Sequence, residues 1–177
     1  MPRSGNVDRT IRQSLQAFAD KALEPSWRGR EREAISHYAF GYLLPHFNGR
    51  LPFSHPAQIG IEVCVPGVPD HNVKGRVNKD LVIWGTRRIA ATWNEEWLPT
   101  FAPRCILEWT YSRTGHGWRK AWEYDITWLR AFTEERRGCI GYAVALVVAA
   151  GSQQLLVARV ALGRANLKWL VHSPRVA

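Results

Sequence analysis

Two stretches near the amino terminus carry apolar residues at helical spacing. In the first, this spacing predicts a helix from Arg9 to Leu23, which ends before Pro25. In the second, REREAISHYAFGYLLPHF, apolar residues recur mostly at i, i+3 and i+4 and predict a helix over 29–44 that Pro45 ends. The sequence therefore predicts a first helix that forms a cap or arm, and a second helix that begins the core.

Strand patterns occupy the middle and the carboxy-terminal part of the chain. Three short runs rich in β-branched and apolar residues predict strands at 59–65 (IGIEVCV), 79–85 (KDLVIWG) and 104–111 (RCILEWTY). Two longer runs, IGYAVALVVAA and QLLVARVAL, predict two more strands, and Gly151-Ser152 between them favours a hairpin turn. Between the third and fourth strands, ITWLRAFTEERRG predicts a helix.

The start of this last helix can be placed at either of two positions. A start near Gly117 would put Asp125 amid Trp118 and Trp122 on an apolar face, with no group to offset the cost of burying its carboxylate. A start at Asp125 would use that carboxylate as the N-cap, and Gly138 would end the helix. We therefore predict the start at Asp125. After the amino-terminal helix, the predicted order is helix, three strands, helix, two strands.

The length and composition are those of one globular domain. A chain of 177 residues falls within the size range of a single domain and is long enough to bury a core. The composition, 46% hydrophobic and 22% charged, is typical of globular proteins. We predict a single α/β domain over 1–177, with an amino-terminal helix or arm at 1–28, a core at 29–162 and a basic tail at 163–177.

Several features favour an intracellular protein, and we predict a cytoplasmic one. The amino-terminal residues MPRSGNVDRTIRQ lack the apolar stretch of a secretory signal peptide. The longest apolar run, from Cys139 to Gly151, falls well short of the roughly 20 residues that cross a bilayer, so we expect a buried strand and no membrane partner. Cys64, Cys105 and Cys139 lie far apart within apolar segments, as free thiols do in a reducing compartment.

The charge of the chain favours a polyanionic partner. The chain has 24 Lys and Arg against 15 Asp and Glu, a formal net charge of +9, and such a surplus attracts nucleic acid. A basic protein without a nucleic-acid role is the alternative. Nucleotide hydrolysis, α/β-hydrolase chemistry and zinc catalysis are disfavoured, because the sequence has no Gly-rich phosphate loop, nucleophile elbow or HExxH pattern. The candidate nucleic-acid contacts are Arg87, Arg88, Arg113, His116, Arg164 and Lys168.

Two carboxylates stand inside otherwise apolar predicted strands, Asp80 in KDLVIW and Glu108 in CILEW. Burying a lone carboxylate is costly, so each is expected to have a cation, strong hydrogen bonds or a metal as its partner. With Glu33 on the early helix, they could supply the oxygen ligands that Mg²⁺ requires, with Mn²⁺ as its expected substitute. Each acid also fits a structural role: Asp80 opening its strand, Glu108 facing solvent on an edge strand, or Glu33 in a first helical turn.

The order of these features along the chain carries a family resemblance. Glu33 on a helix, IEVCV, Asp80 in KDLVIW, Glu108 in ILEW and the helix at YDITWL span roughly residues 30–160. This order resembles the αβββαβ core of the PD-(D/E)XK nuclease superfamily. The resemblance implies a restriction endonuclease-like fold, with a mixed central sheet flanked by helices. It also implies that Asp80 and Glu108 are catalytic and bind Mg²⁺, and that Glu33, or alternatively Glu31, adds a helix acid to this site.

One position departs from the motif of this superfamily. The family's lysine should stand two residues after Glu108, where this chain has Thr110, which carries no positive charge. In the family, this lysine is thought to orient or activate water and to stabilise developing negative charge. Lys120 is the first candidate to replace it in catalysis, ahead of Lys79 and Arg113. Adjacent strand residues point to opposite faces, so Lys79 is expected to point away from the acid beside it.

Three functions follow from these observations. The first, which the resemblance implies, is a Mg²⁺-dependent nuclease that acts on DNA by phosphodiester hydrolysis. The second, which Thr110 favours, is a catalytically inactive nuclease-fold protein that serves as a nucleic-acid-binding or protein-interaction module. The third is a basic scaffold protein whose acids are structural. The first two also leave room for a homodimer or for a partner subunit that supplies target recognition.

Overall fold

The computed structural model describes residues 4–22, 29–49, 53–68, 76–85, 103–149 and 152–172. Six strands form one mixed sheet in the order β1-β2-β3-β4-β5-β6, in which β3 and β4 are parallel and all other neighbours are antiparallel. The strands are β1 (Ile59–Pro66), β2 (Arg76–Trp84), β3 (Pro103–Ser112), β4 (Ile140–Ala149), β5 (Ser152–Ala161) and β6 (Arg164–His172). The helices are α1 (Ser4–Ala22), α2 (Glu31–Tyr38) and α3 (Trp118–Glu135). The predicted α/β class is confirmed.

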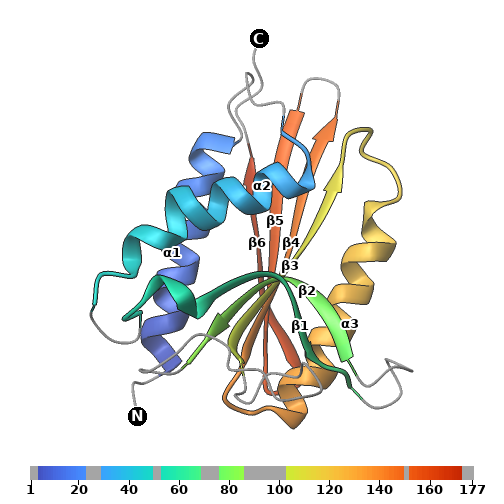
Figure 1. Ribbon diagram of the computed structural model, residues 1–177. Coiled ribbons are helices and arrows are strands. Elements are labelled where there is room, and N and C mark those ends of the chain that lie inside the picture. The colour runs from blue at the N-terminus through green and yellow to red at the C-terminus, as the bar shows by residue number, and fades with distance from the viewer. Residues whose placement is uncertain are drawn as a thin grey trace.

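The sheet lies between two layers of helices, with α1 and α2 on one face and α3 on the other (Figure 1). Side chains of β3 alternate between the two resulting cores. Cys105 and Leu107 join the core beneath α1 and α2, whereas Ile106 joins the core beneath α3. α3 packs closely on β4 at Gly141, where a Cβ would lie 2.8 Å from Leu129 Cδ2. Central strands therefore have both faces covered, and any polar group on them needs a partner within the protein.

The two amino-terminal helices lie close to where apolar spacing predicted them. The apolar stripe of α1 is fully buried in the core, at Ile11, Leu15, Phe18 and Ala19. α2 is shorter than predicted, because the chain continues as a π-helical turn, Ala39–Leu43, and a 3-10 turn, Leu44–His46. Pro45 lies in that final turn, and since proline has no backbone N–H to donate, the regular helix does not continue through it.

The predicted start of α3 at Asp125 is wrong. The helix begins at Trp118, directly after Gly117, whose φ of +74° suits glycine. Asp125 therefore lies inside the helix among apolar residues, the placement that the cost of burying a lone carboxylate argued against. The Thr110 hydroxyl offsets that cost by donating a hydrogen bond of 3.1 Å to Asp125 Oδ2. Because Thr110 belongs to β3, this partner could not be identified from the residues around Asp125.

Residues 164–172, predicted as part of a basic tail, instead form the edge strand β6, which pairs with β5. The turn before β6 has positive φ at both Leu162 (51°) and Gly163 (71°), as a two-residue hairpin turn of type I′ requires. Gly163 N–H also donates a 3.2 Å hydrogen bond to the Thr133 hydroxyl of α3. The alternation of polar and apolar residues in RANLKW is a strand pattern, which its basic charge had obscured.

A polar cluster joins α1 to the sheet. Asp8 Oδ1 accepts a hydrogen bond from the Tyr142 hydroxyl of β4 and another, at 2.7 Å, from Arg159 Nε of β5. The Tyr142 side chain is fully buried, and burial raises the pKa of its hydroxyl well above the usual range. α1 is thus part of the core rather than an arm, because it contributes both apolar packing and this ion pair.

Two further predictions concern the apolar segments. The longest apolar run forms a strand, β4, and is buried from Ile140 to Val147. All three cysteines are free, and Cys105 and Cys139 are buried. Over the described ranges of the chain, no helix is both long enough and apolar enough to cross a membrane.

Candidate active site

The regular ladder between β2 and β3 ends where Leu81 lies opposite Leu107. Next to this point, β2 changes the face to which its side chains point. Leu81 packs in the core beneath α1 and α2, whereas Lys79 places its Nζ 3.6 Å from the ring centroid of Trp128 on α3. Regular alternation would put residues 79 and 81 on the same face, so the strand is irregular at Asp80.

In β1, the side chains also change the face of the sheet to which they point, at the position opposite Asp80. Ile61 packs against the core beneath α1 and α2, and Val63 packs against the core beneath α3. Between them, Glu62 has a φ of +52°, an unfavourable backbone conformation for a residue with a side chain. The register of the two strands places Glu62 opposite Asp80. The sheet is therefore distorted at one place in both strands, and Asp80 lies at that place.

Carboxylates bind two backbone amides of β3 beyond the end of the ladder. Trp109 N–H donates to Asp80 Oδ2 at 2.7 Å, and Tyr111 N–H donates to Glu31 Oε2 at 3.1 Å. These carboxylates accept the hydrogen bonds that backbone carbonyl groups of a neighbouring strand would accept in a regular sheet. As a result, acids from β2 and α2 lie along one edge of β3.

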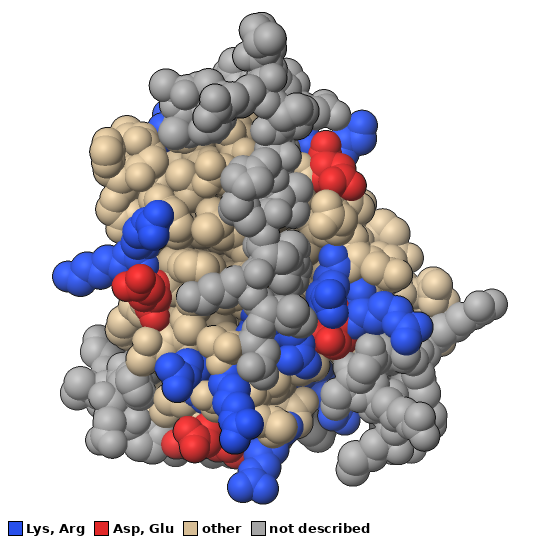
Figure 2. Space-filling model, turned by 180° about the vertical axis from the view of Figure 1, so that it is seen from behind, with Lys and Arg blue, Asp and Glu red and all other residues tan. Residues whose placement is uncertain are grey.

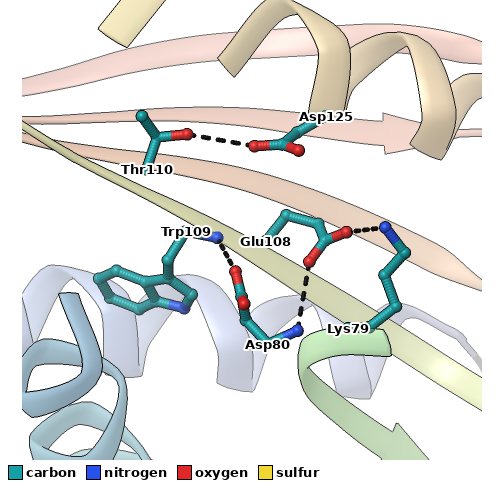
Figure 3. A network of polar contacts seen from close by, with 6 residues as sticks. All are labelled: Lys79, Asp80, Glu108, Trp109, Thr110 and Asp125. Carbon is teal, nitrogen blue, oxygen red and sulfur yellow. Dashed lines mark hydrogen bonds and ion pairs between the residues drawn. The ribbon is translucent and has the colours of Figure 1, made fainter. Parts of the chain in front are cut away.

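Asp80 and Glu108, the predicted acidic pair, lie side by side (Figure 3). Asp80 N–H donates to Glu108 Oε2 at 3.2 Å, and the charge of Asp80 raises the pKa of Glu108. The second oxygen of Glu108, Oε1, forms a buried ion pair with Lys79 Nζ. Lys79 and Glu108 are each only 5% exposed. Glu108 is therefore tolerated inside an apolar strand because a lysine from the next strand lies against it.

The structure adds Asp125 to this group of acids. Thr110, at the position where the resemblance expects a lysine, donates its hydroxyl hydrogen to Asp125 (Figure 3). A carboxylate thus lies beside the position that a cation would occupy in the nuclease motif. Helical periodicity through Trp118 and Trp122 was the signal that could have identified Asp125. That periodicity does not reveal the partner of the charge, because Thr110 comes from another element.

Negative charge exceeds positive charge in this part of the molecule. Burial raises the pKa of Glu108 to about 7, and the Lys79 ammonium offsets only part of that effect. Burial also raises the pKa of Asp125 to about 6. The pKa values of Asp80 and Glu31 are raised by burial as well, and the Asp80 charge raises that of Glu31 further. The arrangement therefore favours the uptake of protons or of a cation.

The geometry favours Glu31 over Glu33 as the helix acid. Glu33 is exposed, and its Oε2 accepts a 3.0 Å hydrogen bond from Arg30 N–H in a capping box at the start of α2. Glu31 is half-buried and accepts the hydrogen bond from Tyr111 described above. The two acids are two residues apart on a helix, so only one of them faces the sheet.

Lys79 is the lysine that the structure brings to the acids, although Lys120 was the first candidate. Lys120 is exposed on the first turns of α3. The expectation that Lys79 points away from Asp80 assumed regular alternation along β2. That assumption fails at the distortion beside Asp80, and the Lys79 side chain instead reaches Glu108.

The candidate nucleic-acid contacts do not form one group. Arg113 and His116 are exposed in the loop that follows β3, and the His116 carbonyl accepts a 3.1 Å hydrogen bond from the Ser112 hydroxyl. Arg164 is exposed at the opposite end of the sheet, since Ala161, its partner across the β5–β6 turn, pairs with the start of β4. Arg87 and Arg88 lie outside the described residues, as does the side chain of Lys168 on β6.

On the face shown in Figure 2, the described basic and acidic side chains are interspersed. The net charge of +9 is therefore not gathered into one continuous basic patch among the described residues of that face. The net positive charge attracts polyanions in general. The described residues of this face do not form one continuous basic surface along which a nucleic acid would bind.

The acids fit Mg²⁺ by their chemistry but are not arranged as a complete metal cage. Among the residues that the structure describes, no group of three or more His, Cys, Asp or Glu side chains is arranged to hold a metal ion. The donors are nevertheless all carboxylate oxygens, which hard divalent cations prefer. Asp80 and Glu31 each use one oxygen on an amide of β3, and a carboxylate has about four lone-pair sites, so acceptor capacity is left.

Comparison with known proteins returned no match of any kind: no family model, no curated protein and no solved structure matches this chain. The class of this protein therefore rests on its own architecture. It is an α/β protein with a six-stranded mixed sheet, in which one buried carboxylate, three half-buried ones and a buried lysine lie near a distortion shared by β1 and β2.

Proposed function

We propose that this chain is a Mg²⁺-dependent nuclease-like protein that acts on DNA by phosphodiester hydrolysis. The observation that carries the proposal is the contact of Asp80 with Glu108 at a distorted strand pair, with more carboxylates around them than the Lys79 ammonium can balance. A buried surplus of like charge is destabilising by itself, and perturbed acids of this kind gather at functional sites.

The element order gives a second line of support. A helix, three antiparallel strands, a crossover helix and a fourth strand parallel to the third follow one another as α2, β1, β2, β3, α3 and β4. This is the order expected of a restriction endonuclease-like core. In such a core, the acids of the second and third strands bind the metal, and here they are Asp80 and Glu108.

In this proposal, Asp80, Glu108 and Glu31 would hold the ion. Mg²⁺ would supply a Lewis acid for the phosphate oxygens and would make a bound water more acidic. The chain contributes orientation: Trp109 N–H fixes Asp80, and Tyr111 N–H fixes Glu31, both from the backbone of β3. Because these donors belong to a central strand, the acids are held more firmly than loop residues would be.

The charge of the chain supports DNA as the substrate class. The net charge is +9, and Arg113 and His116 lie in the loop that follows the acid-bearing part of β3. Arginine pairs well with phosphate oxygens, so this loop is the first place at which we expect contact with a DNA backbone.

A cleavage assay tests the proposal. Purified protein should cut duplex or single-stranded DNA in the presence of Mg²⁺ or Mn²⁺, and EDTA should stop the reaction. Asp80→Ala and Glu108→Ala should remove the activity, whereas Asp20→Ala, on the exposed side of α1, should retain it. Activity that persists in either of the first two variants would refute the assignment of the acids.

One observation favours the inactive alternative. Thr110 is bound to Asp125, so a negative charge lies where a nuclease of this kind needs a positive one. If this difference abolishes turnover, the protein should bind DNA with an affinity that falls steeply with salt and should cut it under no divalent ion. Absence of binding even at low salt would instead leave the basic scaffold protein as the remaining function.

A further inference from the structure

Lys79 occupies an unusual position for a lysine. Its side chain is only 5% exposed, whereas lysines normally keep their ammonium group in water. The face change at Asp80 turns Lys79 inward to α3, where Nζ lies 3.6 Å from the ring centroid of Trp128 and against Glu108 Oε1. Both contacts favour a cation, the first through the electron-rich face of the indole and the second through a full negative charge.

The surroundings hold this ammonium in place. Trp128 is fully buried, and its ring stacks on Phe132 with 4.9 Å between centroids, so the surface beneath Lys79 is fixed. On the other side, the backbone of Lys79 is paired with Val63 of β1. The lysine is thus seated between a rigid aromatic ring and the acid that the proposed function assigns to the metal.

We propose that the Lys79 ammonium is the resident cation of this site and that it competes with a divalent ion for Glu108. This inference rests on the proposed function only in requiring that the site takes a divalent cation. Two cations that bind one carboxylate repel each other, so a metal ion must either displace Lys79 from Oε1 or bind beside it at reduced affinity. The lysine would therefore keep the affinity of the site for metal low.

The test is a Mn²⁺ titration of three variants and the unaltered protein by calorimetry. Lys79→Met removes the ammonium and keeps an unbranched apolar chain over Trp128. Lys79→Gln also removes the charge but keeps a hydrogen-bond donor for Glu108, which covers the case in which Lys79→Met does not fold. Lys21→Met, on an exposed part of α1, makes the same change in net charge elsewhere. Circular dichroism establishes that each variant is folded.

We expect Lys79→Met and Lys79→Gln to bind Mn²⁺ at least about tenfold more tightly than the unaltered protein, and Lys21→Met to stay within about twofold. Equal or weaker binding by the folded Lys79 variants overturns the inference, and so does a failure of every protein to bind Mn²⁺. A tighter Lys79 variant that cuts no DNA would refute the nuclease proposal and leave this inference standing. Metal-dependent DNA cleavage by the unaltered protein, together with Lys79 variants that bind Mn²⁺ no more tightly, would refute this inference and leave the nuclease proposal standing.

Discussion

Two clusters in this molecule join carboxylates to a cation, and they differ in their balance of charge. In the first, Asp8 of α1 is bound by the Arg159 guanidinium and the Tyr142 hydroxyl, so one acid faces one cation. In the second, the Lys79 ammonium pairs with Glu108 while three further carboxylates lie around them. The first cluster is complete within the protein, and the second has a surplus of negative charge.

This difference separates a structural tie from a candidate site. The Asp8 cluster links a helix to two strands, a role that its contacts explain fully. The acids around Lys79 are held at a strand distortion where Glu62 adopts an unfavourable φ, and burial raises their pKa values. Burial alone does not distinguish the clusters. The clusters differ in two other features, the surplus of negative charge and the distorted backbone. Both features lower stability and neither is needed to complete the core, so they point to a functional site.

The largest expected effect is on cleavage. Asp80→Asn should lower the rate of Mg²⁺-dependent DNA cleavage by at least about 100-fold, because a neutral amide binds a hard cation poorly. The free energy of unfolding should not fall in parallel, since the substitution removes a buried charge whose pKa burial had raised. Initial rates and urea denaturation measure the two quantities. If Asp80→Asn lost enough stability to explain its loss of activity, the acids around Lys79 would have a structural role, as the Asp8 cluster has.

The Asp8 cluster should show the opposite behaviour. Asp8→Ala should lower the free energy of unfolding by about 2–4 kcal/mol, because it removes the carboxylate that accepts from the buried Tyr142 hydroxyl and from Arg159 Nε. The response of the protein to Mg²⁺ should not change. Urea denaturation measures the loss, and Asp20→Ala on the exposed part of the same helix, which should cost far less, is the control. Equal costs at the two positions would contradict the structural role of Asp8.

The charge surplus should also be visible in the pH dependence of stability. Burial raises the pKa of Asp125 from an ordinary 3.8 to about 6, so the folded state holds this proton more tightly than the unfolded state. Its contribution to stability is therefore full below pH 4 and is lost as pH rises through about 6. Asp125→Asn avoids that loss and can still accept from Thr110.

Asp125→Asn should thus be more stable than the unaltered protein by about 1–3 kcal/mol at pH 8, with no gain at pH 4. Thermal denaturation across this range, in EDTA so that no divalent ion contributes, measures the difference. A gain at pH 4 as large as that at pH 8 would mean that the charge of Asp125 is not the cause.

The smallest expected difference separates two acids on one helix. Glu31→Gln should weaken Mn²⁺ binding by about three- to tenfold, because it removes one carboxylate from the site. Glu33→Gln should leave Mn²⁺ affinity within about twofold and change stability by less than about 1 kcal/mol, because glutamine can retain the capping contact with Arg30. Calorimetry measures both affinities. Weaker binding in Glu33→Gln alone would restore Glu33 as the helix acid.

Much of the fold could be predicted from local pattern. Helical and strand periodicity located α1, the α2 region and five of the strands, because each of these elements buries a face whose spacing is visible in the sequence. β6 was missed because its alternation is carried by basic residues. The start of α3 was misplaced because the partner that allows Asp125 inside the helix, Thr110, comes from another element.

The sequence by itself determined which acids stand in apolar strands and that Thr110 stands where the nuclease resemblance expects a lysine, because both are properties of neighbouring residues. Only the tertiary structure decided that Lys79 reaches Glu108 and that Glu31 faces β3. The physical reason is the face change at Asp80. The alternation of side chains between the two faces of a strand is a local rule. At Asp80 this rule is overridden by the register of β2 with β1 and β3 and by packing on α3.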